Sequence, residues 1–275
     1  MAGIKWLYTK KNMSWGSNAW KIRTFLANAI VPQNSDMVKE FFPEKQNLNL
    51  IPIGIDVSDF AVKDDISDIK SQYDLENSQP VIITIANVIP IKGIEFLIKG
   101  FELILEDLPE AKLLVIGEDK TEYADTLKQE LVEKGLDGHV IFTGRQSEIR
   151  PFFRVADIFI LSSMKTGEGG PISVLEAMAS GVLCYGSDVS GIRDQFKELP
   201  DQLFESENPG AIANKILHAM RLTKEEKDAR IRKQYEFIME YYSIENEVKK
   251  LEQLYKDLAG VTKNKGKKVE CARTL

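Results

Sequence analysis

The sequence predicts an α/β fold with a doubly wound parallel sheet, because short apolar runs alternate with longer segments of helical periodicity. The predicted strands are continuous, mostly β-branched runs at residues 81–85, 113–116, 140–143, 158–161 and 182–185. Runs of this kind indicate strands that are buried on both faces, as in a parallel sheet. Repeated strand–helix–strand units predict right-handed crossovers and helices on both faces of the sheet.

Composition predicts a folded chain of one large domain, or of one domain and a fraction. The chain has 275 residues, of which 43% are apolar and 28% are charged. A chain this apolar can offset the entropy of ordering, which excludes disorder as its main state. The net charge of −6 argues against a globally basic nucleic-acid binder, so no nucleic-acid partner is expected.

Cysteine usage and the apolar runs predict a cytoplasmic chain. Cys184 and Cys271 lie far apart and neither belongs to a Cys-x-x-Cys pair, so no disulfide or zinc–thiolate framework is expected. No apolar run approaches the roughly 18–20 residues that span a bilayer. The N-terminus lacks the apolar region and cleavage site of a signal peptide. We therefore expect a location in the cytoplasm, with at most a peripheral contact at the inner face of the membrane.

The N-terminal part differs from the rest of the chain. Residues 29–32 and 48–52 are predicted as strands, with a helix over 35–42 between them, and two strands cannot close a sheet alone. Residues 1–35 contain five basic side chains, no acidic ones and the three tryptophans, Trp6, Trp15 and Trp20. This composition suits a nucleic-acid or membrane surface or, as the favoured interpretation, the edge of a domain. Apolar surface around these tryptophans would make the chain prone to associate.

The C-terminal part is predicted to be helical. An earlier helix is expected over 94–108, and Thr223 with Glu226 has the spacing of a capping box. One apolar stripe of the last helix comprises Ile244, Val248, Leu251, Tyr255 and Leu258. Residues 261–275 are rich in lysine and are expected to form a disordered solvated tail, the alternative being a weak contact with an anionic membrane.

A ligand site is expected at one edge of the sheet. Ligands of doubly wound sheets bind outside the carboxyl ends of the strands, where the strand order reverses. The loops that follow Ala86, Gly117, Gly144 and Leu161 occupy these positions.

The stretch from Glu168 to Gly181 follows the last of these loops and carries the most chemistry. Pro171 suits a first helical turn, and Ile172, Leu175 and Ala179 are predicted to form the buried face of the helix. Gly169 and Gly170 stand directly before it and leave bare backbone donors at the positive end of the helix dipole. Such a helix start binds a phosphate or a sugar oxygen.

Two carboxylates, Glu168 and Glu176, flank this helix start. A carboxylate would repel a phosphate, so these side chains are expected to accept hydrogen bonds from hydroxyls, and a vicinal diol matches the two oxygens of one carboxylate. Phosphate donors beside diol acceptors favour a sugar nucleotide as ligand. The alternative is that Glu168 is an acid favoured by the helix dipole and Glu176 a surface residue of the helix.

In its order of motifs the chain resembles the retaining glycosyltransferases often called group 1, which have the two-domain GT-B fold. Residues 168–181 are similar to the Glu-x7-Glu signature of that family. The other similar segments are 51–56 with Phe60, 86–93, 141–144, 186–193 and 202–204. The resemblance extends over roughly residues 25–260. It implies that residues 63–260 form the donor-binding, Rossmann-like half of the fold, and that residues 1–62 are a remnant of the acceptor-binding domain with the linker.

The resemblance also implies roles for the residues at the helix start. Glu176 would accept hydrogen bonds from the ribose hydroxyls, and Glu168 would hold the donor sugar and help its departure. The backbone donors of Gly169, Gly170, Pro171 and Ile172 would face the sugar and the diphosphate; because proline has no N–H, Pro171 itself would supply no donor.

The resemblance implies further roles for residues in the family's first strand-to-helix loop and in the loop after its fourth strand. Lys92 would stabilise the charge of the leaving diphosphate, and Gly144 and Arg145 would lie near the base. Asn87 stands where the family commonly has an arginine, which weakens the diphosphate clamp; Arg145 and Arg193 are the candidates to compensate. The alternative for Lys92 is a solvated lysine at a helix start.

No metal site is expected, because the sequence has no Asp-x-Asp triplet, no P-loop and no His-Glu-x-x-His arrangement. His139 precedes a strand and His218 lies in a helical stretch, so both are expected to be structural or surface residues. We expect no required cofactor; the nucleotide-diphosphate sugar is the donor substrate.

The function implied by the resemblance is transfer of a hexosyl or related group, with retention, in the synthesis of a surface polysaccharide or glycoconjugate. A UDP-sugar is the favoured donor, and the acceptor is a glycan or a lipid-linked saccharide. Because little of an acceptor-binding domain is recognisable, a separate acceptor-domain subunit or a homo-oligomer is an expected partner, and a longer gene product is the favoured explanation. The alternatives are a nucleotide-sugar binding or scaffolding subunit without turnover and, less favoured, a sugar-nucleotide epimerase.

Overall fold

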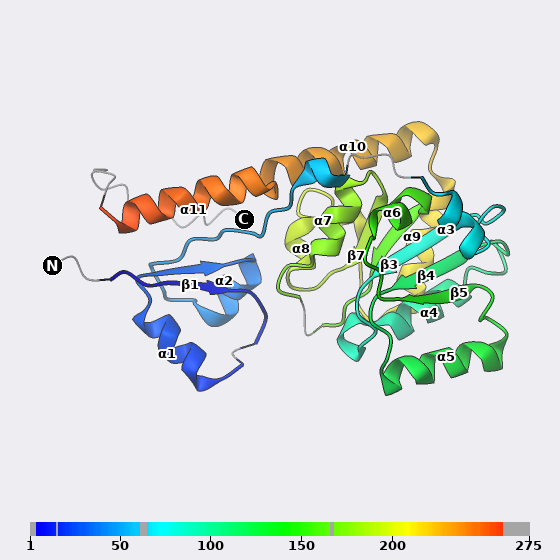
Figure 1. The fold of residues 1–275 in the computed structure, drawn as a ribbon, viewed down its shortest axis with the longest axis horizontal. Coiled ribbons are helices and arrows are strands. Elements are labelled where there is room, and N and C mark those ends of the chain that lie inside the picture. The colour runs from blue at the N-terminus through cyan, green and yellow to red at the C-terminus, as the bar shows by residue number, and fades with distance from the viewer. Residues whose placement is uncertain (1–3, 15, 61–64, 166–167, 261–275) are drawn as a thin grey trace.

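The computed structural model describes residues 4–14, 16–60, 65–165 and 168–260 and contains two parallel sheets (Figure 1). The smaller sheet pairs β1 (Leu7–Lys10) with β2 (Ala29–Pro32). The larger sheet has six strands in the order β5-β4-β3-β6-β7-β8. The predicted boundary at residues 62 and 63 lies outside the described residues and stays a prediction.

The larger sheet confirms the predicted fold class. Its strands are β3 (Val81–Ile85), β4 (Lys112–Ile116), β5 (Val140–Gly144), β6 (Ile158–Leu161), β7 (Leu183–Ser187) and β8 (Leu203–Phe204). All neighbouring strands are parallel, and the five predicted strands are found within two residues of their expected bounds. The strand order reverses between β3 and β6, which makes the carboxyl ends of these two strands the switch point where ligands bind.

Two apolar clusters cover the two faces of this sheet. In β3, Ile82 packs into one cluster while Val81 and Ile83 pack into the other, as the alternation of side chains along a strand requires. The first face is covered by α4 (Ile94–Glu102), α5 (Glu122–Lys134) and α9 (Pro209–Arg221). The second is covered by α3 (Ser67–Gln72), α6 (Arg150–Val155), α7 (Ile172–Ala179), α8 (Ile192–Gln195) and α10 (Lys224–Tyr241).

The helix predicted over 94–108 is shorter in the structure. α4 ends at Glu102, and the chain continues in turns because Ile104 N donates to Phe101 O and Leu105 N to Glu102 O, which are three-residue bonds rather than α-helical ones.

The smaller sheet carries α1 (Asn18–Leu26) and α2 (Ser35–Phe41), and a short 3₁₀ helix, η1 (Val57–Phe60), follows. The strand predicted over 48–52 is wrong as a regular strand: Leu48 forms only an isolated bridge with Ile30. The segment runs beside β2, with Asn49 N donating to Ile30 O and Ile51 N to Pro32 O. On the β2 side Ile30 N donates to Asn47 O, but Pro32, the next residue that faces this segment, has no N–H to donate, so a continuous ladder cannot form.

The last two helices link the sheets. The predicted capping box of α10 is confirmed, with Glu226 N donating to Thr223 Oγ1 and Thr223 N to the Glu226 carboxylate. We call the six-stranded sheet with its helices the larger unit, and the two-stranded sheet with α1 and α2 the smaller unit. The next helix, α11 (Ile244–Leu258), reaches from the larger unit across the sheet of the smaller unit (Figure 1). Its Leu254 is buried against Ala29, Val31 and Ile51 of that smaller unit.

The apolar stripe predicted for the last helix is only partly right. Leu251 and Leu258 pack against the smaller sheet, but Val248 and Tyr255 are exposed and Leu254 takes the buried position. The buried face of α11 thus differs from the predicted stripe, because the helix packs only on the narrow two-stranded sheet and on Ile51 of the 48–52 segment.

The β1–α1 region exposes apolar side chains on its surface. Trp6 is 49% exposed, Trp20 is half-buried, and Trp15 lies outside the described residues. The other large exposed apolar side chains of this region are Ile4, Ile22, Phe25 and Leu26. Association through this surface stays a prediction.

Three sequence-based expectations concern the cysteines, the tail and the membrane. The Cys184 thiol is buried, and Cys271 and the predicted tail at 261–275 lie outside the described residues. Within the described ranges, none of the helices combines the length and the apolar character that crossing a bilayer demands.

Candidate functional site

The loops that follow β3 and β6 are bonded together at the switch point. After β3 the chain turns through the short 3₁₀ helix η2 (Pro90–Lys92), and Gly93 then has a left-handed φ of 62°. Ser162, directly after β6, donates its hydroxyl to the carbonyls of Lys92 and Gly93 at 3.0 and 3.1 Å. A Cβ on Gly93 would lie 2.3 Å from Ser162 O, so only glycine allows this contact. The turn that carries Lys92 is thereby fixed to the loop that leads to Glu168.

Lys92 and Glu168 form an ion pair at this point. Lys92 Nζ lies 2.5 Å from Glu168 Oε1, and the two side chains are only 21% and 13% exposed. Ser163 Oγ donates to the same carboxylate oxygen at 2.5 Å. The sequence analysis did not single out Ser163. The sequence signal that could have found it is the polar pair Ser162–Ser163, which directly follows the apolar run of β6.

The stretch before α7 brings backbone close to backbone. A Cβ on Gly169 would lie 1.8 Å from the carbonyl oxygen of Lys11, which belongs to the loop after β1. A Cβ on Gly170 would meet only Ile53 at an ordinary 3.7 Å. Gly169 therefore has a packing reason of its own, besides the bare amide expected from the sequence.

The helix α7 starts close to where the sequence predicts. Pro171 is its N-cap residue and Ile172 its first residue. Leu175 and Ala179 are buried as expected, but Ile172 is 42% exposed, so its assignment to the buried face is wrong. The physical reason is position: the first residue of α7 stands at the carboxyl edge of the sheet, above the layer in which Val174 and Met178 are buried.

Glu176 lies on α7, one turn beyond the helix start, and is half-buried. Burial raises the pKa of its carboxyl from 4.5 to about 6, because water no longer fully solvates the charge. A side chain on a solvated helix face, the alternative considered from the sequence, would not show this desolvation.

This shift predicts a stability that depends on pH. The folded chain keeps the Glu176 proton in a pH range where the unfolded chain has released it. The contribution of this group to the free energy of unfolding is therefore fully present below pH 4.5 and is lost as the pH rises through about 6. With allowance for remaining solvent contact, the loss is about 1 kcal/mol. Unfolding by denaturant should show it as a difference between the parent and Glu176→Gln that grows over this range; a constant difference would contradict it.

The remaining predicted donor-binding residues lie along the same edge of the sheet. Asn87 is exposed after β3, and its Oδ1 accepts a 3.4 Å bond from Glu118 N. Gly144 ends β5 with a φ of 70°, and its carbonyl accepts from Gly117 N at 3.1 Å. Arg145 is exposed beside it. Three strand spacings separate β5 from β6, about 14 Å, so these residues share the edge with Glu168 without touching it.

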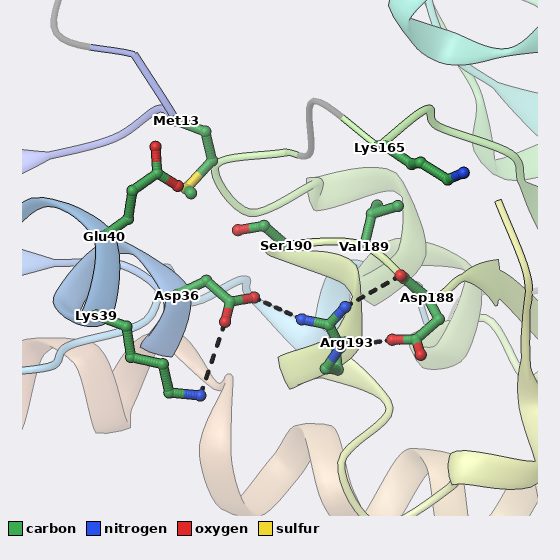
Figure 2. A pocket seen from close by; sticks show the side chains of 9 residues that line it. All are labelled: Met13, Asp36, Lys39, Glu40, Lys165, Asp188, Val189, Ser190 and Arg193. Atoms are coloured by element: carbon green, nitrogen blue, oxygen red, sulfur yellow. Dashed lines mark hydrogen bonds and ion pairs between the residues drawn. The ribbon is translucent and has the colours of Figure 1, made fainter.

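Arg193, one of the two candidates to compensate for Asn87, is engaged elsewhere (Figure 2). Its guanidinium pairs with Asp188 at 2.5 Å and with Asp36 of α2 at 2.8 Å. It therefore joins the two units of the chain.

A cavity of about 420 Å³ surrounds this ion-pair group. Its lining residues, drawn in Figure 2, are Met13, Asp36, Lys39, Glu40, Lys165, Asp188, Val189, Ser190 and Arg193. Lys92, Glu168 and Glu176 do not line it. The carbonyl of Ser190 accepts from Glu168 N at 2.8 Å, so this cavity lies behind the Glu168 backbone rather than in front of its carboxylate.

The described part of the chain contains no group of three or more His, Cys, Asp or Glu side chains that could hold a metal ion. His139 Nδ1 lies 3.1 Å from Ala111 O, between the starts of β4 and β5, and His218 lies in the last turn of α9. Neither is near the Lys92–Glu168 pair.

Comparison with known proteins decides the family. Residues 65–237, well over half of the chain, match the family described as glycosyl transferases group 1. The chain belongs to this family. HepE from Anabaena, solved in complex with UDP and glucose, has the same fold with a TM-score of 0.78 and 18% identity, over 93% of this chain and 71% of that one. The predicted Rossmann-like, GT-B type of fold is thus confirmed.

The match to curated relatives covers only part of this group 1 chain and part of each relative. N-acetyl-α-D-glucosaminyl L-malate synthase of Bacillus anthracis is 32% identical over 130 residues, covering 47% of this chain and 33% of that protein. UDP-Gal:α-D-GlcNAc-diphosphoundecaprenol α-1,3-galactosyltransferase of Escherichia coli is 24% identical over 158 residues, covering 56% and 40%. The matched part of the chain thus spans between a third and two fifths of these relatives.

Proposed function

We propose that this group 1 chain binds a nucleotide-diphosphate sugar, with a UDP-sugar favoured, and forms the donor half of a retaining glycosyltransferase. The observation that carries the proposal is the Lys92–Glu168 pair. Two side chains 76 residues apart meet at the switch point of the sheet, directly before the helix that carries Glu176. This is where a doubly wound sheet binds its ligand.

The charges at this site suit a diphosphate leaving group. Lys92 holds its cation against Glu168, and an entering diphosphate would compete for that cation. The Glu168 carboxylate would then accept a hydrogen bond from a sugar hydroxyl. In the transfer, the bond between the anomeric carbon and the diphosphate oxygen breaks, the acceptor hydroxyl bonds to that carbon, and its proton passes to the departing diphosphate oxygen. Lys92 and the backbone amides at the start of α7 would stabilise the charge left on the diphosphate.

Glu176 suits the ribose. Its half-buried carboxylate lies on a rigid helix, and two oxygens of one carboxylate match a vicinal diol. Gly144 and Arg145, farther along the edge, stay our candidates for contacts near the base, and Asn87 for a weak contact near the diphosphate.

The relatives support the choice of donor and acceptor. HepE is named in complex with UDP and glucose, and the Escherichia coli relative by a UDP-sugar and a diphosphoundecaprenol acceptor. We infer a UDP-sugar donor and a glycan or lipid-linked acceptor, in surface polysaccharide or glycoconjugate synthesis. We infer that the transfer reaction takes place in the cytoplasm, with at most a peripheral contact of the protein at the inner face of the membrane.

A second candidate function is a nucleotide-sugar binding or scaffolding subunit. It is favoured by the smaller sheet, which has only two strands among the described residues. A separate acceptor-domain subunit or a second copy of the chain would then complete the cleft. Transfer by the purified chain alone would reject this candidate, and activity that appears only with a partner would support it.

Titration calorimetry with UDP tests the proposal. Glu176→Ala and Lys92→Ala should each weaken binding by about tenfold or more, because each removes a charge-assisted hydrogen bond. Matched controls are Glu102→Ala and Lys134→Ala, which break an exposed 2.6 Å ion pair between the ends of α4 and α5. The controls should bind as the parent does. Absence of UDP binding, or binding that both site substitutions leave unchanged, would reject the site.

A further inference from the structure

One side chain of the smaller unit holds the backbone of the Glu168 loop. Asn34 follows β2 and is 2% exposed. Its Nδ2 donates to the carbonyls of Glu168 and Gly169 at 3.2 and 2.7 Å. Its Oδ1 accepts from Met37 N at 2.7 Å and so caps α2. A single amide thus joins the start of α2 to the loop that carries Glu168.

The backbone beside Asn34 is fixed against the larger unit. Asp194 of α8 accepts hydrogen bonds from Ser35 N and Ser35 Oγ at 2.5 and 2.6 Å, which fixes the start of α2 against the larger unit. A second contact between the two units lies nearby, where Lys11 O packs against Gly169. The position of Asn34 beside the Glu168 loop is therefore fixed by its neighbour Ser35.

The loop that carries the Lys11 carbonyl is held by the side chain of the neighbouring Lys10. The Lys10 side chain is 1% exposed, and its ammonium donates to the carbonyls of Asn12 and Ser14 and lies 4.3 Å from the centre of the Phe41 ring. A buried ammonium satisfied by loop carbonyls fixes the loop after β1. The Glu168–Gly169 backbone is thereby packed between this loop and Asn34.

The remaining anchors of the Glu168 loop come from the larger unit. Glu168 N donates to Ser190 O at 2.8 Å, and Gln195 Nε2 donates to Pro171 O at 2.9 Å. The loop is thus bonded to the larger unit on one side and to Asn34 on the other. Loss of the Asn34 amide would leave the carbonyls of Glu168 and Gly169 without this donor. A buried carbonyl without a hydrogen bond costs free energy, so the loop is expected to move until these carbonyls find another donor or water.

We propose that Asn34 is a positioning residue of the donor site: it holds the Glu168–Gly169 backbone so that the Glu168 carboxylate stays beside Lys92 and faces the donor sugar. The inference rests on the proposed function of Glu168. It makes the smaller unit part of the donor site, although every donor-binding residue predicted from the sequence lies in the larger one. Because Glu176 stands on α7 rather than on this loop, the contact to the sugar should depend on Asn34 more than the contact to the ribose.

The test separates the two bonds that Asn34 makes. Asn34→Ser keeps a good helix cap but places no donor at the loop, whereas Asn34→Ala removes both. Asn208→Ser is the matched control: Asn208 caps α9 through Ala211 N in the same way, and its amide donates to Glu205. Each variant is measured as the full chain, with the melting temperature, the hydrogen exchange of the Glu168 and Met37 amides by NMR, and the Kd for UDP-glucose and for UDP.

We expect Asn34→Ser to keep the parental exchange at Met37 but to speed exchange at Glu168 by about tenfold, since its bond to Ser190 O loses support. The Kd for UDP-glucose should rise by about tenfold, and that for UDP by less. Asn34→Ala should add faster exchange at Met37 and a lower melting temperature. Asn208→Ser should leave the Glu168 amide and both Kd values unchanged.

Parental exchange at Glu168 together with parental Kd values in Asn34→Ser would overturn the inference alone. An equal rise of the two Kd values would also overturn it, because a general structural role would act on both ligands. Absence of binding of either nucleotide by the parent would overturn the proposed function and the inference with it.

Discussion

Gly169→Ala should lower the free energy of unfolding by about 1–3 kcal/mol, because its Cβ would lie 1.8 Å from the carbonyl oxygen of Lys11. That carbonyl is backbone, in a loop that the buried Lys10 side chain fixes through Asn12 O and Ser14 O, so the Glu168 loop must yield instead. We expect UDP-glucose binding to weaken by about tenfold or more as the loop leaves its position. Denaturant unfolding and calorimetry measure the two effects.

The neighbouring glycine supplies the control for stability. Gly170→Ala adds the same methyl group one residue later, where it would meet only Ile53 at 3.7 Å, and the unfolding free energy should change by less than about 1 kcal/mol. Gly138→Ala, with open space around its Cβ, is the control for binding. Equal destabilisation by Gly169→Ala and Gly170→Ala would show that the close approach of Lys11 to Gly169 does not exist in solution.

Lys92→Met should destabilise the chain by about 2 kcal/mol, since it leaves the mostly buried Glu168 carboxylate without its cation. Glu168→Gln in the same chain should restore part of this loss, because the neutral amide has no charge to compensate. A double-mutant cycle measured by denaturant unfolding should therefore give a coupling of about 1–3 kcal/mol between the two side chains.

The exposed pair Lys134–Glu102 is the comparison for this cycle. Its nitrogen and oxygen lie 2.6 Å apart, but its side chains are 44% and 38% exposed, so its coupling should be about 0–1 kcal/mol and should fall with added salt. A coupling for Lys92–Glu168 no larger than that of the control would mean that the pair is solvated and that its charges are not held together at the switch point.

Much of the fold was predictable because its signals are local. The run at 158–161 is apolar throughout and the run at 81–85 is apolar except for Thr84, and a strand buried on both faces needs little more information than that. Thr223 and Glu226 predict their helix start because a capping box joins residues three apart. The segment 48–52 was mistaken for a strand because the proline that interrupts its pairing, Pro32, lies on another segment, which periodicity does not relate to it.

The candidate site was predictable in part for the same reason. Lys92 follows one apolar strand and Glu168 another, and parallel strands bring their carboxyl ends to one edge, so the sequence alone places both residues there. Which side chains bond to them was not predictable. Ser163 gave only a weak signal, and Asn34 gave none, because its contact is with a loop 134 residues away.

The amino-acid order was enough to specify the parallel sheet, the helix start after Gly169 and Gly170, and the family, because each depends on neighbours along the chain. Three features came from packing between distant segments: the half-buried state of Glu176, the contact of α11 with the smaller sheet, and the hold of Asn34 and Lys11 on the Glu168 loop. Burial and close backbone approach depend on which surfaces meet in space, and local periodicity carries no record of that.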